Sequence, residues 1–158
     1  MKAMSELPVK TNGAAREYIT FRIGSQYFCV DIMSVREIRG WTPATALPRA
    51  PGFVRGVINL RGIVLPVIDL AERLGFYPAE PTPRHVIIVA QTGRQIVGLL
   101  VDAVSDIIAL PSDKVQATPD VGSEAAHSFI VGVMAIDDRM ISLVALDSIM
   151  PSVSGEAA

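Results

Sequence analysis

The feature that most constrains the fold is an internal repeat, in which the second half of the 158-residue chain copies the pattern of the first. At an offset of 69 residues the matched pairs are Gly24 and Gly93, Gln26 and Gln95, Val35 and Val104, Glu37 and Asp106, and Ile38 and Ile107. At an offset of 76 they are Phe53 and Phe129, Gly56 and Gly132, Val57 and Val133, and Leu60 and Ile136. Two residues more bring Asp69 over Asp147. The repeat predicts two similar five-stranded lobes, each with its own small core.

Within each copy, apolar and polar residues alternate with the period of a β-strand. Residues 18–23 and 27–32 alternate around a Gly-Ser turn, residues 35–39 are extended, and residues 53–70 form a hairpin. Asp69 and Glu72 have the spacing of a helix-capping box, which predicts a short helix, and Asp147 is expected to cap a second one. The pattern therefore predicts an all-β fold of small barrels with short helices.

The composition excludes several classes of protein. Half of the residues are hydrophobic, 19% are charged and the net charge is -2, so there is no basic footprint for nucleic acid. The apolar runs are too short to span a bilayer, and the first 15 residues lack a signal peptide. The single Cys29 allows no internal disulfide. We therefore expect a cytoplasmic protein without membrane insertion.

No set of residues suggests catalysis. His85 and His127 have no partner at metal-binding spacing, and neither a serine-nucleophile signature nor a phosphate-binding glycine loop is present. We predict no catalytic residues, no metal and no cofactor. Two alternatives stay open at this point, namely a barrel that binds a small ligand between its lobes and a barrel that binds nucleic acid.

The two copies differ at the hairpin tip, and a difference between copies is not dictated by the shared fold. The tip reads Asn59-Leu60-Arg61-Gly62 in the first copy and Ala135-Ile136-Asp137-Asp138 in the second. An ordinary solvated turn is the simpler interpretation. The difference nevertheless favours a recognition role for Asn59 and Arg61.

Charge is divided unevenly between the copies. Residues 16–73 hold eight arginines and five acidic residues, whereas residues 84–150 hold four basic and eight acidic residues. Related lobes of opposite sign suit head-to-tail contact with a similar domain, and such contacts can close a ring.

Three segments together resemble the CheW-like domain family of bacterial chemotaxis. They are Ser34-Val35-Arg36-Glu37-Ile38-Arg39-Gly40, Gly56-Val57-Ile58-Asn59-Leu60-Arg61-Gly62, and residues 97–106, Val-Gly-Leu-Leu-Val-Asp-Ala-Val-Ser-Asp. The resemblance runs from about residue 17 to residue 150. It implies two SH3-like five-stranded barrels packed around a shared hydrophobic interface.

The resemblance also implies a non-enzymatic adaptor that joins the cytoplasmic tip of chemoreceptors (methyl-accepting chemotaxis proteins) to the regulatory domain of the histidine kinase CheA. Such an adaptor lies in the cytoplasm at receptor arrays, and an adaptor of a non-motility pathway is an alternative. By motif, the receptor groove would be lined or supported by Val35, Glu37, Gly56, Asn59, Arg61, Gly62, Val104 and Ile107. Exposed strand residues such as Val86 and Ile87 would contact the kinase. Arg61 could instead brace its own lobe through Glu37 or Asp69.

The expected domain organisation follows from the repeat and the resemblance. Residues 1–15 are a flexible tail, residues 16–150 form the CheW-like domain, and residues 151–158 are a second tail. The first barrel covers about residues 16–77 and the second about 84–150, with the chain free to cross between them.

Overall fold

The computed structural model describes residues 15–76, 80–117 and 128–150. The predicted tails, residues 1–15 and 151–158, lie outside the described residues except for Ala15, and so does His127. The elements in chain order are β1 (Ala15–Ile23), β2 (Gln26–Asp31), the 3-10 turn η2 (Ile32–Ser34), β3 (Val35–Gly40), β4 (Val54–Leu60), β5 (Ile63–Asp69), α1 (Leu70–Arg73), β6 (Val86–Thr92), β7 (Gln95–Val101), β8 (Ala103–Pro111), η3 (Ser112–Lys114), β9 (Gln116–Ala117), β10 (Ile130–Ile136), β11 (Arg139–Val144) and α3 (Leu146–Ile149).

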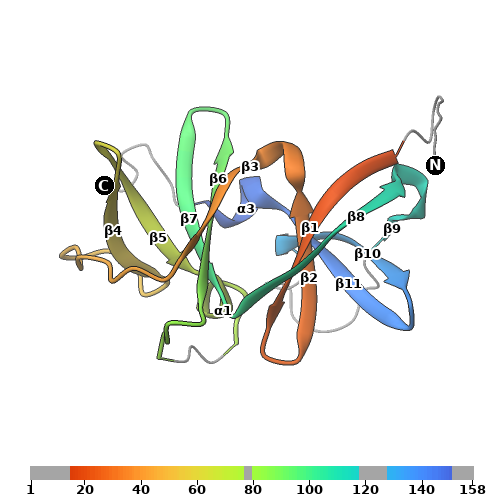
Figure 1. Ribbon diagram of the computed structural model, residues 1–158, viewed down its shortest axis with the longest axis horizontal. Helices are drawn as coiled ribbons and strands as arrows, with labels where there is room; N and C mark the ends of the chain where they lie inside the picture. The colour runs from red at the N-terminus through yellow and green to blue at the C-terminus, as the bar shows by residue number, and fades with distance from the viewer. Residues whose placement is uncertain (1–14, 77–79, 118–127, 151–158) are drawn as a thin grey trace.

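The strands form two strongly curved sheets that lie side by side along the length of the molecule (Figure 1). One has six strands in the order β8-β1-β2-β11-β10-β9, and the other has five in the order β3-β6-β7-β5-β4. The predicted all-β class with two barrel-like units and short helices is confirmed. The sixth strand, β9, pairs with Gly132 and Val133, and its counterpart in the other sheet is an isolated bridge between Thr45 and Val57.

Each sheet takes strands from both halves of the chain. The leading hairpin β1–β2 joins β8 and β11, and its repeat copy β6–β7 joins β3 and β5. The strands of one sheet thus come from residues 15–31, 103–117 and 130–144, and those of the other from residues 35–69 and 86–101. The chain therefore crosses between the two barrels, which the sequence left open, and the barrels do not coincide with residues 16–77 and 84–150. The chain crosses between the sheets at Ile32–Ser34 and again at Asp102.

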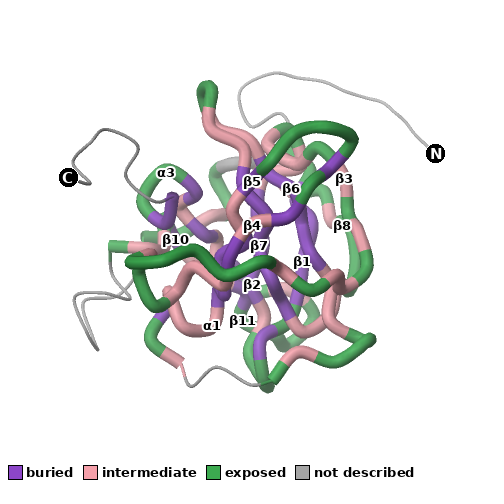
Figure 2. Tube along the Cα trace, turned by 90° about the vertical axis from the view of Figure 1, so that its left-hand side faces the viewer, coloured by how far each residue is buried: buried purple, intermediate pink, exposed green. Residues whose placement is uncertain are grey.

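The packing explains this exchange of hairpins. The largest core, between the two sheets, receives Phe28 and Val30 from β2 and Val97 and Leu99 from β7. Neighbouring residues of the same strands, such as Cys29 and Leu100, point the other way into the core of one barrel. Strands β2 and β7 are therefore buried on both faces, as the purple centre of Figure 2 shows, and a strand of that kind must occupy an inner position in its sheet.

The repeat is visible in local geometry. Hairpin β4–β5 turns through Arg61 and Gly62, with φ of 53° and 89°, and hairpin β10–β11 turns through Asp137 and Asp138, with φ of 51° and 66°. Two-residue turns with both φ values positive match the twist of the strands that they join. Helices α1 and α3 follow the two hairpins at equivalent positions.

The two helices begin differently. Asp69 caps α1 as predicted, because its Oδ1 accepts a hydrogen bond from the Glu72 N–H at 3.2 Å. The prediction that Asp147 caps the second helix is wrong, since α3 begins after Ala145 and has no side-chain cap. Ala145, at the same offset of 76 as the rest of the hairpin, is the true counterpart of Asp69.

Candidate protein-binding face

Half of the predicted receptor-binding residues lie on β3 and β8, which are the terminal strands of their sheets. Both run along the same side of the molecule, the right-hand side in Figure 2 and the front in Figure 1. Helix α3 lies on the opposite side. A terminal strand has backbone groups that its own sheet leaves unpaired along one edge, so this side is suited to contact with another chain.

Apolar side chains are exposed on these strands and on the turn that leads into β3. Ile107 is 59% exposed on β8, Ile38 is 44% exposed on β3, and Met33 in η2 is 86% exposed. The predicted residues Val35 and Val104 are half-buried and pack against the core between the sheets, so they support this surface from beneath. Met33 and Ile38 were not identified as surface residues from the sequence. The alternation along β3 could have identified Ile38, because it puts Ile38 on the other face of the strand from Val35 and Glu37.

Arg61 and Glu37 come together between β3 and β4, the two edge strands of the five-stranded sheet. The Arg61 Nη2 donates to both carboxylate oxygens of Glu37, at 3.0 and 3.1 Å, and the Arg61 side chain remains 69% exposed. Arg39 approaches the same carboxylate at 3.7 Å. Of the two partners considered for Arg61, the structure selects Glu37, because Asp69 is paired with Arg55 at 2.9 Å. Beneath the pair is a small pocket of about 90 Å³ with an apolar floor that includes Leu60 and Leu65.

Three further predicted residues shape the hairpin. The Asn59 Oδ1 accepts a hydrogen bond from the Gly62 N–H at 2.9 Å and so braces the turn that presents Arg61. Gly56 is buried, has a φ of 145°, and lies so close to the loop before β4 that a Cβ would stand 2.2 Å from the Thr45 carbonyl oxygen. Gly56 therefore allows the backbone of β4 to approach the loop before it closely.

We define the β3–β8 face as Met33, Arg36, Glu37, Ile38, Arg61 and Ile107.

The expectation that Val86 and Ile87 are exposed is wrong. Ile87 is 0% exposed in the core of the five-stranded barrel, and Val86 is half-buried against the core between the sheets. Strand β6 is an inner strand, so its apolar run mainly reports burial: the Ile87 side chain offers no surface for a partner, and Val86 is only partly accessible.

The cysteine and the histidine among the described residues, Cys29 and His85, have structural roles. Burial, with a smaller contribution from Asp31, raises the pKa of the Cys29 thiol to about 12, so the thiol is protonated and unreactive at neutral pH. The His85 Nδ1 accepts from the Thr82 N–H at 3.0 Å, and its Nε2 lies 3.4 Å from Asp102 at the second crossover. Within residues 15–76, 80–117 and 128–150, no group of three His, Cys, Asp or Glu is placed to hold a metal ion.

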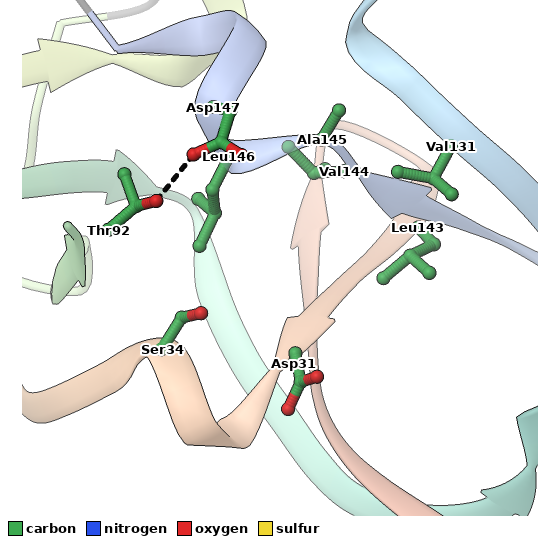
Figure 3. Close-up of a pocket in the computed structure, with 9 residues that line it drawn as sticks. All are labelled: Asp31, Ser34, Thr92, Val131, Leu143, Val144, Ala145, Leu146 and Asp147. Atoms are coloured by element: carbon green, nitrogen blue, oxygen red, sulfur yellow. Dashed lines mark hydrogen bonds between the residues drawn. The ribbon is translucent and has the colours of Figure 1, made fainter.

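A pocket of about 280 Å³ lies between the sheets beside α3 (Figure 3). Three of its polar side chains are already engaged with protein groups: Thr92 donates to Asp147, and Asp31 accepts from the Met33 N–H and pairs with Arg16. Its remaining walls are mostly aliphatic, from Val131 and residues 143–146. The pocket therefore lacks a convergent set of polar groups for a small ligand, which argues against the ligand-binding alternative.

The fold defines a protein of two barrel-like β-sheets, and comparisons with known proteins give its class. The family model described as "CheW-like domain" matches residues 17–154. The chain is 57% identical over 155 residues to the probable chemotaxis protein CheW of Rhizobium etli, covering 98% of this chain and 100% of that relative. It is 62% identical over 148 residues to the chemotaxis protein CheW of Rhizobium meliloti, covering 94% and 95%.

A solved structure agrees with these sequence relatives. The crystal structure of the scaffolding protein TtCheW from Thermoanaerobacter tengcongensis matches with a TM-score of 0.79 at 30% identity, covering 87% of this chain and 89% of that one. The chain therefore belongs to the CheW family of chemotaxis scaffold proteins, which are not enzymes. No helix within the described residues is long and apolar enough to cross a membrane.

Proposed function

We propose that this protein is a cytoplasmic adaptor that couples chemoreceptors to the histidine kinase CheA at membrane-associated receptor arrays. The observation that carries the proposal is the β3–β8 face, where two terminal strands from different sheets run along one side of the molecule (Figure 2). These strands carry the exposed side chains of Ile38 and Ile107, and the exposed guanidinium of Arg61 follows β4 in the same sheet as β3. Family membership supplies the pathway.

The receptor is expected to contribute a helix from its cytoplasmic tip. An amphipathic helix can place its apolar stripe over Ile38, Ile107 and the flexible Met33 while its polar flank meets Arg61. Arg61 is suited to this because its planar guanidinium binds carboxylate or carbonyl oxygens through two parallel hydrogen bonds. Val35 and Val104 pack against the core and so support the strands that carry the exposed side chains. Gly56, Asn59 and Gly62 maintain the shape of the hairpin that carries Arg61.

The regulatory domain of CheA is the second proposed partner, and the charge distribution supports contact with a similarly folded domain. Between residues 32 and 101 the described chain has eight arginines and four acidic residues, whereas residues 15–31, 102–117 and 128–150 hold four basic and eight acidic residues. When the charges are grouped by sheet, the two halves of the molecule therefore still differ in the sign of their net charge, as the repeat predicted. Lobes of opposite sign favour head-to-tail contacts, including a ring with other CheW-like domains.

The proposal is tested by replacing one exposed apolar residue on the face and one elsewhere. Ile107→Ser should weaken binding to receptor-containing membranes by on the order of tenfold, because it removes apolar contact area from the centre of the interface. Met140→Ser is the control, since Met140 is 61% exposed on β11, away from the face. Equal receptor binding by both variants would contradict the assignment of the face.

A further inference from the structure

Helix α3 completes the six-stranded half of the molecule, yet side chains of the five-stranded half hold it at both ends. At its first turn, the Thr92 hydroxyl of β6 donates to the Asp147 carboxylate. At its last turn, the Arg73 Nε donates to the Ile149 carbonyl and its Nη2 donates to the Ser148 carbonyl, both at 3.2 Å. Because backbone carbonyls at the end of a helix lack partners within the helix, a guanidinium is a fitting cap for them.

Arg73 also lies between two aromatic rings that are equivalent in the repeat. Its guanidinium carbon is 4.1 Å from the centroid of Phe53 and 4.8 Å from that of Phe129. Each phenylalanine carbonyl accepts a hydrogen bond from the residue before its own helix, Asp69 N at 2.7 Å and Ala145 N at 2.8 Å. Arg73 therefore joins the two copies at equivalent points.

Only the first copy supplies such an arginine. The counterpart of Arg73 in the second copy is Ile149, which is fully buried in the core between the sheets. Arg73 itself is half-buried, and burial lowers the pKa of its guanidinium, which nonetheless stays charged in proteins. A guanidinium that stacks on both rings and donates to two carbonyls restrains both the distance between α1 and α3 and their relative orientation.

The contact lies on the far side of the molecule from the β3–β8 face. Figure 2 places α3 on the left, α1 at the bottom slightly left of centre, and β3 and β8 on the right. The core between the sheets receives residues from α1 and α3. The two covalent crossovers, Ile32–Ser34 and Asp102, lead directly into β3 and β8. A change in the angle between the sheets would therefore move β3 relative to β8, and Arg73 opposes such a change from the other side.

We propose that Arg73 is a positioning residue that fixes the angle between the two sheets and thereby the spacing of β3 and β8. This inference rests on the proposed function only in giving that spacing a purpose, namely the display of a receptor-binding face. The spacing itself is a property of the isolated protein, and it can be measured without receptor or kinase.

The test is a distance measurement by pulsed electron paramagnetic resonance between spin labels at Ile38→Cys on β3 and Ala109→Cys on β8. Native Cys29 is 0% exposed and its raised pKa keeps it protonated, so it does not take up label in the folded protein. The parent should give one narrow distance distribution. Arg73→Met should shift or broaden it, because methionine fills the space between the rings but cannot hydrogen-bond Ile149 and Ser148.

Arg139→Met is the matched control, because Arg139 stacks on Tyr27 at 4.4 Å within the six-stranded sheet alone. It should leave the distribution unchanged, and Arg73→Lys should fall between the parent and Arg73→Met. An unchanged distribution for Arg73→Met, even with a lowered melting temperature, would reduce Arg73 to a stabilising contact and overturn the inference. Equal broadening by Arg139→Met would overturn it as well. Loss of receptor binding plays no part in either outcome, so failure of the proposed function is recognised separately.

Discussion

The Arg61 guanidinium bonds to the Glu37 carboxylate across the open seam of the five-stranded barrel. Glu37 lies on β3 and Arg61 follows β4, and these strands are the two edges of the same sheet. The ion pair thus links edges that no ladder of backbone hydrogen bonds connects, and it leaves most of the Arg61 side chain in solvent. It braces the lobe and presents a cation at the same time.

Arg61→Ala should separate these two roles. Because the side chain is 69% exposed, loss of the pair should lower the free energy of unfolding by no more than about 1 kcal/mol. Receptor binding should fall, since alanine removes the fork of donors that Arg61 presents from the hairpin tip. Urea unfolding and co-sedimentation with receptor membranes measure the two effects. A well-folded variant with unchanged receptor binding would leave Arg61 only its bracing role.

Gly56→Ala should be strongly destabilising, by at least about 3 kcal/mol, because it combines a positive φ with a clash against the Thr45 backbone. Gly40→Ala is the control, since no atom lies within 4 Å of the point that a Cβ would occupy there and the φ of Gly40 is ordinary. Chemical denaturation compares the two. Similar small losses would show that the loop before β4 moves aside easily.

Ala145→Ser should stabilise the protein by about 0.5–1 kcal/mol. Ala145 occupies the capping position of α3 without a side-chain acceptor, whereas Asp69 at the equivalent position caps α1. Ala145→Val, which offers no acceptor, is the comparison, and thermal unfolding gives the difference. If the serine and valine variants had the same melting temperature, a side-chain cap at position 145 would not stabilise α3, and the prediction would be wrong.

Stability should fall in alkaline solution because of Cys29. Burial raises the pKa of this thiol from 9.0 to about 12, so the folded state holds the proton more tightly than the unfolded state. The resulting stabilisation is complete below about pH 9 and is lost as the pH rises toward 12. Burial also raises the pKa of Tyr18, which acts in the same direction.

Urea unfolding at pH 8 and pH 10.5 measures this loss, and Cys29→Ala should show a smaller difference between the two pH values. The thiol of the native protein should also resist alkylation at pH 8 until denaturant is added. Rapid alkylation of the folded protein would contradict the burial of Cys29.

The sequence predicts the strands, the hairpin tips and the Asp69 cap because these depend on nearby residues. The exchange of hairpins is different, because alternation shows which residues are buried but not which strand lies alongside. The apolar run at Val86 and Ile87 illustrates the limit: a strand buried on both faces and an exposed apolar strand look alike in sequence. Asp147 shows a similar limit, since the sequence does not distinguish an acidic residue in the first turn of a helix from one at the N-cap.

The candidate site is predictable to a similar extent. The repeat singles out Arg61 because the second copy differs there, but the choice between Glu37 and Asp69 as its partner depends on which strands form the edges of the sheet. The exposure of Met33 depends on a capped turn, which holds the side chain in solvent. Arg73 gives no signal, since the two carbonyls to which it donates lie 75 and 76 residues away in the chain.

Co-sedimentation tests directly whether this protein joins a receptor to a kinase, as we propose. Purified CheA is mixed with receptor-containing membranes, with and without the protein, and the kinase in the membrane pellet is measured. If the protein links the two partners, the kinase should enter the pellet in amounts that rise with added protein, and Ile107→Ser should reduce the effect. Kinase recovery that is independent of the protein, or that Ile107→Ser and Met140→Ser reduce alike, would contradict the proposal.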